Sequence, residues 1–154
     1  MMTKFTKSRI GASGVLLLQS RLLREEIESA PMTTDYGIDL VAISPRSDKT
    51  FLIQVKTTMK EKPAGGKVGA KKELSFPPHK RNSCAQYLAL VYPPENKIWI
   101  LTKEELESVD CQKNGKNYHV VIWREPRPNS NNNRSEEYFE RYSFDNAINK
   151  YFLK

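Results

Sequence analysis

Apolar residues near the start of the chain recur with the spacing of an amphipathic helix. They lie three and four residues apart and so share one helix face, which is formed by Val15, Leu18 and Leu22. Ser13 is a suitable N-cap, and Pro31 disfavours helical backbone in the residue before it. The pattern predicts a first helix over residues 11–26.

Shorter apolar segments bounded by turn residues follow, and they indicate β-strands. The turn-forming residues 45–49 and 93–96 each separate two such segments, which predicts two antiparallel hairpins. Pro77 and Pro78 end a short segment that we expect to be an edge strand. The expected strands are residues 38–43, 51–58, 74–76, 87–92, 97–101 and 118–123.

Helical signals return in the second half of the chain. Thr102 and Glu105 have the spacing of a capping box at the start of a short helix. The Pro- and Asn-rich residues 124–134 predict a loop. The expected C-terminal helices are residues 135–141 and 145–153, within the segment 135–154. This order of elements predicts a single α/β (α+β) domain over residues 1–154, with a mixed β-sheet core and flanking helices.

The composition narrows the possible functions. The chain has 25 Lys and Arg against 18 Asp and Glu, and this net charge of +7 favours a polyanionic partner such as nucleic acid. The apolar run at residues 15–18 is too short for a membrane helix or a signal peptide. We therefore expect no membrane partner and a cytoplasmic (intracellular) location. Cys84 and Cys111 lack metal-binding spacing, and we expect both to be reduced.

Three polar residues interrupt two strands that are otherwise apolar. Alternation places Gln54 and Lys56 on one face of their strand, while Asp39 shares a face with Val41 and Ile43. Burying such groups without partners costs several kcal/mol, so their presence requires an explanation. Three explanations are open: a buried Asp39–Lys56 ion pair beside Gln54, a solvent-exposed face, or a metal site with a catalytic lysine.

This arrangement resembles the PD-(D/E)xK nuclease superfamily, whose members have the restriction-endonuclease-like fold. In that superfamily, an Asp on one strand of a hairpin and a (Glu/Gln)-x-Lys on the next strand meet at the end of the sheet. Gly37-Ile38-Asp39 matches the first half of the motif, and Gln54-Val55-Lys56 matches the second. The likeness is greatest to small single-domain members: archaeal-type Holliday junction resolvases and a compact bacterial homing endonuclease type that also carries Gln.

The resemblance implies Mg²⁺- or Mn²⁺-dependent hydrolysis of phosphodiester bonds. Asp39 is then the principal metal ligand, and Gln54 offers its side-chain carbonyl as a second ligand. Lys56 positions the attacking water or stabilises charge that grows on the phosphate. Relatives often carry a Glu on the first helix where this chain has Val15. Gln19, one turn later on the same face, is either a substitute ligand or an ordinary helix residue.

A basic segment follows Lys56. Residues 59–73 alternate Lys with Gly and Pro, which predicts a mobile basic loop. This loop either contacts DNA phosphates or is simply solvated. The residues that we expect to contact DNA are Lys60, Lys62, Lys67, Lys71, Lys72, Lys80 and Arg81.

Other residues carry weaker signals. His79 and His119 lie far apart without a nucleophile partner, and we interpret both as ordinary residues. Asp35 is either a turn residue or a ligand. A C-terminal aromatic cluster forms core or an oligomer contact, or else stacks on bases; its members are Tyr138, Phe139, Tyr142, Phe144, Tyr151 and Phe152.

The sequence therefore predicts a metal-dependent DNA endonuclease, with site-specific homing or restriction cleavage favoured. The alternatives are a Holliday junction resolvase-type nuclease, a toxin-type nuclease, and a non-catalytic nucleic-acid-binding protein with a nuclease fold. No separate DNA-reading domain fits in 154 residues. Double-strand cleavage then requires a homo-oligomer, either a dimer or a tetramer.

Overall fold

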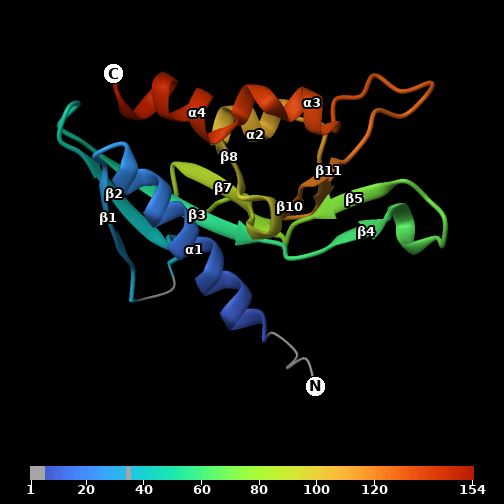
Figure 1. Ribbon diagram of the computed structural model, residues 1–154, viewed down its shortest axis with the longest axis horizontal. Helices are drawn as coiled ribbons and strands as arrows, with labels where there is room; N and C mark the ends of the chain where they lie inside the picture. The colour runs from blue at the N-terminus through green and yellow to red at the C-terminus, as the bar shows by residue number, and fades with distance from the viewer. Residues whose placement is uncertain (1–5, 34–35) are drawn as a thin grey trace.

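Five strands form the central mixed sheet of the computed structural model, which describes residues 6–33 and 36–154. Their order is β1-β2-β3-β7-β8, and all neighbours are antiparallel except β3 and β7, which are parallel. The strands are β1 Glu28–Pro31, β2 Leu40–Ser44, β3 Lys49–Thr57, β7 Tyr87–Tyr92 and β8 Lys97–Thr102. The expected mixed sheet with flanking helices is confirmed, as are both hairpins, β2–β3 and β7–β8 (Figure 1).

Helix α1 (Lys7–Arg24) packs on one face of this sheet and begins earlier than the sequence predicts. Its N-cap is Thr6, so the expected cap at Ser13 is wrong: the Ser13 hydroxyl lies within the helix and donates to the Ile10 carbonyl at 2.7 Å. A Cβ on Gly14 would lie 1.9 Å from the Thr57 hydroxyl oxygen. Glycine at this position therefore lets α1 approach the end of β3 closely.

Two three-stranded sheets lie beyond the other face of the central sheet. One has the order β11-β5-β4 and the other β6-β10-β9. Their strands are β4 Glu61–Pro63, β5 Lys72–Ser75, β6 His79–Lys80, β9 Gln112–Asn114, β10 Asn117–His119 and β11 Val121–Trp123. The first of these sheets extends away from the central sheet as an arm, at the right in Figure 1.

These small sheets correct several sequence-based expectations. The sequence predicts a loop over residues 59–73, but this segment contains β4 and the start of β5; its mobility stays a prediction. β5 is the middle strand of its sheet and not an edge strand. The single strand expected over 118–123 is two strands, β10 and β11, in different sheets. The strand is interrupted at Val120, which belongs to neither sheet. The Val120 carbonyl accepts a hydrogen bond from the Phe76 amide at 3.1 Å.

Short helical segments complete the fold and close two hydrophobic cores. They are α2 Lys103–Ser108, α3 Glu136–Phe139, α4 Phe144–Ala147, η1 Ala64–Gly66, η2 Pro93–Glu95, η3 Glu140–Tyr142 and η4 Ile148–Phe152. The capping box of Thr102 and Glu105 at the start of α2 is confirmed. One core lies between the central sheet, α1, α4 and η4; the other lies between the opposite sheet face, the small sheets, α2 and α3.

The C-terminal aromatic cluster belongs mainly to these cores. Four of its rings are buried, which fits the core interpretation and leaves no exposed ring face on which a base could stack: Phe139, Tyr142, Phe144 and Phe152. Cys84 is exposed, Cys111 is buried, and the two are not bonded to each other. No helix in the described part of the chain is long and apolar enough to span a membrane.

Candidate active site

Asp39 lies where strands β2 and β3 begin to diverge. The paired register of the two strands ends at Leu40 and Ile53. Beyond this pair, the Asp39 amide donates to the Ile53 carbonyl at 2.9 Å, and the Asp39 carboxylate accepts from the Val55 amide at 2.7 Å. A side-chain oxygen thus takes the place of a backbone carbonyl in the ladder. Asp39 is held against the backbone of the residue that separates Gln54 from Lys56.

Gln54 and Lys56 share the face of β3 that points away from α1. Ile53, Val55 and the partly buried α1 residue Val15 belong to the core on the opposite face. Gln54 is only 8% exposed, and Lys56 is half-buried. Lys56 forms no ion pair with any residue in the described ranges. The sequence-based assignment of these side chains to one face is confirmed, and the simple Asp39–Lys56 ion pair is not seen.

His79 is the residue that the sequence interpretation missed. The residue is 4% exposed, and its ring nitrogen Nδ1 forms a hydrogen bond with the side-chain oxygen of Gln54. Burial, with the positive charges of Lys56 and Lys103, lowers the pKa of His79 to about 4. The imidazole is therefore neutral near pH 7, and a neutral imidazole carries a single N–H. No local pattern marks this residue, because strand β6 brings it to Gln54 from a distant part of the chain.

The loop before Asp39 packs against the same group. Gly37 has a φ of +74°, and its carbonyl accepts from the Ser83 hydroxyl at 3.1 Å. A Cβ added to Gly37 would lie 2.9 Å from the Ser83 hydroxyl oxygen and 3.9 Å from the Gln54 side-chain nitrogen. Glycine is required here both for the backbone conformation and for this close approach. Asp35, the other acid considered in this loop, lies outside the described residues.

An open cleft of about 490 Å³ lies beside Asp39, between α1 and the β1 end of the sheet. Val15 and Gln19 line it together with Asp39 and Val55. Val15 and Asp39 therefore face the same cleft, so a carboxylate at position 15 would add an acid to it. The Gln19 amide nitrogen donates to the Ser29 carbonyl at 3.3 Å, which tethers this side chain to β1.

The donor set is sparse but suits a hard divalent cation. In residues 6–33 and 36–154, no three His, Cys, Asp or Glu side chains converge on one point. Asp39 supplies one carboxylate, and the Gln54 amide oxygen has a second lone pair beyond the one directed at His79. Mg²⁺ is bound in many proteins by one or two carboxylates, several waters and substrate phosphate. The residues present therefore fit Mg²⁺ and would bind it weakly.

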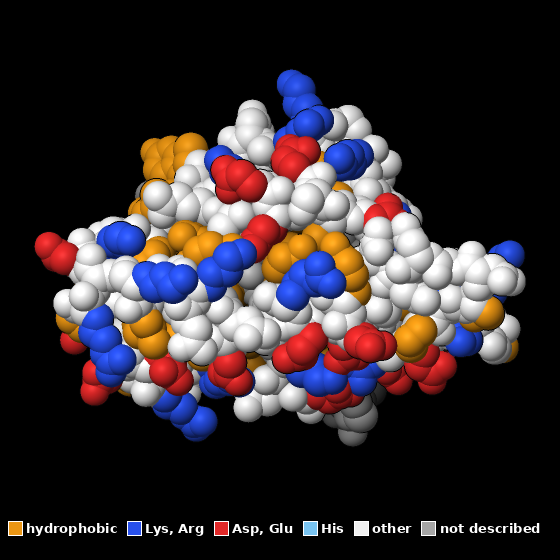
Figure 2. All heavy atoms as spheres, turned by 90° about the horizontal axis from the view of Figure 1, so that it is seen from above, with side chains coloured by type: hydrophobic (Ala, Val, Ile, Leu, Met, Phe, Trp, Pro, Cys, Tyr) orange, Lys and Arg blue, Asp and Glu red, His pale blue; other side chains and the backbone are white. Residues whose placement is uncertain are grey.

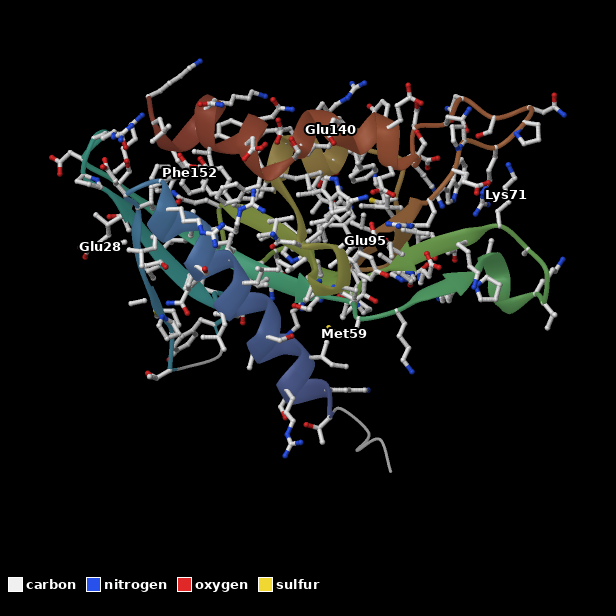
Figure 3. All side chains as sticks on the ribbon, viewed as in Figure 1. Glu28, Met59, Lys71, Glu95, Glu140 and Phe152 are labelled. Carbon is white, nitrogen blue, oxygen red and sulfur yellow. The ribbon has the colours of Figure 1, made fainter. Side chains whose placement is uncertain are left out.

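The seven residues expected to contact DNA are all exposed. Lys71 lies toward the tip of the arm formed by β4 and β5, and Met59 marks where the arm leaves the central sheet (Figure 3). Lys71 pairs with Glu125 and Arg81 pairs with Glu107. Seen from the side of the C-terminal helices, Lys and Arg are interspersed with Asp and Glu, so no single-sign patch covers that face (Figure 2).

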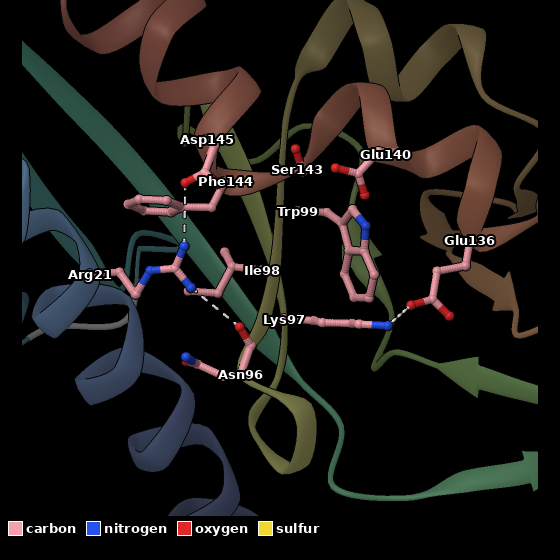
Figure 4. A pocket seen from close by; sticks show the side chains of 10 residues that line it. All are labelled: Arg21, Asn96, Lys97, Ile98, Trp99, Glu136, Glu140, Ser143, Phe144 and Asp145. Carbon is pink, nitrogen blue, oxygen red and sulfur yellow. Dashed lines mark hydrogen bonds and ion pairs between the residues drawn. The ribbon is translucent and has the colours of Figure 1, made fainter.

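A second pocket, of about 160 Å³, lies between α1, β8 and the C-terminal helices. Four of its charged groups are paired: Arg21 bonds to Asp145 at 3.4 Å and to the Asn96 carbonyl at 3.3 Å, and Lys97 bonds to Glu136 (Figure 4). The Arg21 guanidinium also stacks 4.5 Å from the centre of the Phe144 ring. These contacts join α1 and β8 to the C-terminal helices, which is a structural role.

Comparison with known proteins gives a likeness in fold. No family model and no curated protein matches the chain. A solved structure described as a bacterial homing endonuclease, I-Ssp6803I, is similar with a TM-score of 0.62. The match covers 96% of this chain and 91% of that one at 10% sequence identity. At this identity the likeness shows the fold alone: the chain has the mixed α+β fold of that homing endonuclease.

Proposed function

We propose that this protein is a metal-dependent DNA endonuclease that hydrolyses phosphodiester bonds, of the site-specific homing or restriction type. The observation that carries the proposal is the placement of Asp39 against the backbone between Gln54 and Lys56, where two strands diverge. The fold shared with a bacterial homing endonuclease supports it. Lys56, which has no ion-pair partner among residues 6–33 and 36–154, also supports it, because charges at structural positions are usually matched.

Each residue then has a distinct role. Mg²⁺ or Mn²⁺, when bound, polarises the phosphate and acidifies a water molecule. Asp39 and the Gln54 amide oxygen would hold the ion. Lys56 holds the attacking water or neutralises charge on the phosphate in the transition state. His79 fixes the Gln54 amide by hydrogen bonding, as residues behind metal ligands commonly do.

DNA and a second copy of the chain are the partners that this activity requires. The exposed cations of the arm and of β6 would contact phosphates, with an affinity that falls as salt rises. One active centre cuts one strand at a time, so cleavage of both strands at one site calls for a homo-oligomer, either a dimer or a tetramer.

The test is cleavage of supercoiled and branched DNA with and without Mg²⁺ or Mn²⁺. Wild-type protein is compared with Asp39→Asn and Lys56→Met. Matched controls are Asp48→Asn and Lys49→Met, which make the same changes at the opposite end of the same hairpin. Metal-dependent cleavage that is lost in the first pair and kept in the second pair supports the proposal. Preference for branched DNA would identify a junction resolvase instead.

One alternative has its own support. Val15 in place of a helix carboxylate and the neutral Gln54 leave Asp39 as the one acid that lines the cleft in the described part of the chain, which favours a nucleic-acid-binding protein that does not cleave. Binding of DNA by the wild type, with no cleavage of a genomic library under any metal condition, would identify this alternative and contradict the nuclease.

A further inference from the structure

The sheet β6-β10-β9 has one buried and one exposed face. Successive strand residues point to opposite faces, and residues paired across strands point to the same face. On the inner face, Tyr118 pairs with His79 of β6 and with Lys113 of β9. Tyr118 and His79 are buried. On the outer face, Asn117 pairs with Lys80 on one side and with Asn114 on the other, and all three are exposed.

The outer face carries hydrogen-bonding groups and no acid. Residues 112–117 are all exposed, and residues 111–120 contain neither Asp nor Glu. The side chains of Asn114 and Asn117 have no hydrogen-bond partner among the residues that the structure describes. Their donors and acceptors are thus available to a ligand. Gln112 is partly engaged, because its oxygen lies 3.1 Å from the ring nitrogen Nδ1 of His119.

Hydrogen bonds connect this sheet directly to the candidate active site, so the position of the outer face relative to that site is fixed. His79 of β6 lies on the inner face and bonds to Gln54, and the next residue, Lys80, lies on the outer face. His119 at the end of β10 also bonds to Ser75 of β5 at 2.8 Å, which ties the sheet to the basic arm. A duplex held by the arm cations would therefore contact the outer face at a defined distance from Asp39 and Lys56.

We infer that the outer face of β6-β10-β9 reads base edges in the major groove, with Asn114 and Asn117 making sequence-specific contacts and Lys80 contacting a phosphate. A two-stranded ribbon fits the major groove, and an Asn amide matches the paired donor and acceptor of adenine. The inference rests on the proposed function, to which it adds the element that selects the site. It predicts that the recognised sequence contains adenines whose identity depends on these two amides.

The experiment selects duplexes from a random-sequence library with the folded full chain, in Ca²⁺ so that binding is measured apart from cleavage. The wild type is compared with Asn114→Ala, Asn117→Ala and Lys80→Ala. Asn146→Ala, on α4, is the control for loss of an exposed amide away from this face; its side chain is bonded within the protein, to the Glu140 carbonyl at 2.8 Å. Circular dichroism verifies that each variant is folded.

We expect the wild type and Asn146→Ala to enrich the same sequence. Each amide variant loses preference at its own positions, with affinity for the enriched sequence reduced about tenfold or more and affinity for random duplex unchanged. Lys80→Ala weakens binding to all duplexes alike and lowers the salt dependence. Unchanged selection by both amide variants, or no enrichment by the wild type, overturns the inference. Enrichment by the wild type without Mg²⁺-dependent cleavage of the enriched duplex contradicts only the proposed function.

Discussion

The polar residues around Arg124 and those around Asp39 both lie partly out of solvent, but they are built in different ways. The Arg124 guanidinium contacts Glu61 at 3.3 Å, Glu136 at 3.1 Å and also Glu95, and it stacks 5.4 Å from the centre of the Tyr92 ring. Lys97 bonds to two of the same carboxylates. The cluster joins the arm, the turn between β7 and β8, and α3.

The group around Asp39 is built differently. Asp39 bonds to a backbone amide, Gln54 bonds to a neutral histidine, and Lys56 has no ion-pair partner among the described residues. Charge in the Arg124 cluster is paired with opposite charge, whereas neither Asp39 nor Lys56 has an oppositely charged partner among the residues that the structure describes. Matched charge indicates a structural role, and unmatched charge in a comparable setting indicates a binding or catalytic role.

The largest expected effect is that of Lys56→Met on catalysis. Removing a cation that acts on the reacting phosphate should lower the cleavage rate about 10²- to 10³-fold. The free energy of unfolding should stay the same or rise, because the charge removed is half-buried and has no ion-pair partner among the described residues. Single-turnover cleavage and urea denaturation measure the two effects. A variant that cleaves normally would place Lys56 outside the active site.

Arg124→Met should lower stability and leave cleavage unchanged, the reverse of Lys56→Met. It leaves three carboxylates without their common partner, so the free energy of unfolding should fall by about 2–3 kcal/mol. Cleavage per folded molecule should be unchanged, since the cluster does not contact Asp39 or Lys56. Denaturant unfolding and a cleavage assay well below the melting temperature give the two values. A cleavage defect in fully folded protein would contradict the division between the two groups.

His79→Leu tests whether the histidine acts through Gln54. It should lower cleavage about 10- to 100-fold and raise the Mg²⁺ concentration needed for half-maximal rate, as loss of a residue behind a metal ligand does. His79→Asn, which keeps a hydrogen-bonding group near Nδ1, should recover part of the activity at the same Mg²⁺ concentration. Equal loss in both variants with unchanged Mg²⁺ dependence would indicate a role in packing only.

The smallest expected effect is a gain in apparent affinity for Mg²⁺. Val15→Glu adds a carboxylate to the cleft that Asp39 lines, and a second acid should lower the Mg²⁺ concentration for half-maximal cleavage, by about tenfold. Leu23→Glu adds the same charge to α1 beyond this cleft and is the matched control. Similar Mg²⁺ dependence in both variants would show that the cleft is not the metal-binding side of Asp39.

The sequence predicted the central sheet because β2, β3, β7 and β8 each bury apolar residues, and burial leaves a periodic pattern. β1, β4 and β9 were missed for the converse reason, since they bury almost no apolar side chains. β9 is exposed along its whole length and β1 nearly so, and their backbone pairing leaves no pattern of apolar residues.

The candidate site was likewise predictable only in part, where its residues interrupt an apolar strand. Gln54 and Lys56 are detectable as polar residues within an apolar strand. His79 follows two prolines in a segment with no periodicity, so only the folded chain reveals its contact with Gln54. The cap at Ser13 failed because a serine inside a helix can donate to the carbonyl of the preceding turn and gives the same local signal as a cap.

The parallel pairing of β3 with β7 has a consequence for how the chain folds. Ile53 pairs with Tyr87, so the whole segment between them, including the arm and β6, must be looped out before the central sheet can close. The entropy of closing such a loop is lost before the pairing is gained, and non-local contacts of this kind slow folding. The β2–β3 and β7–β8 hairpins are local and can form first. Asp39 meets β3 within the first hairpin, whereas His79 reaches Gln54 only once residues 58–86 have taken their final path.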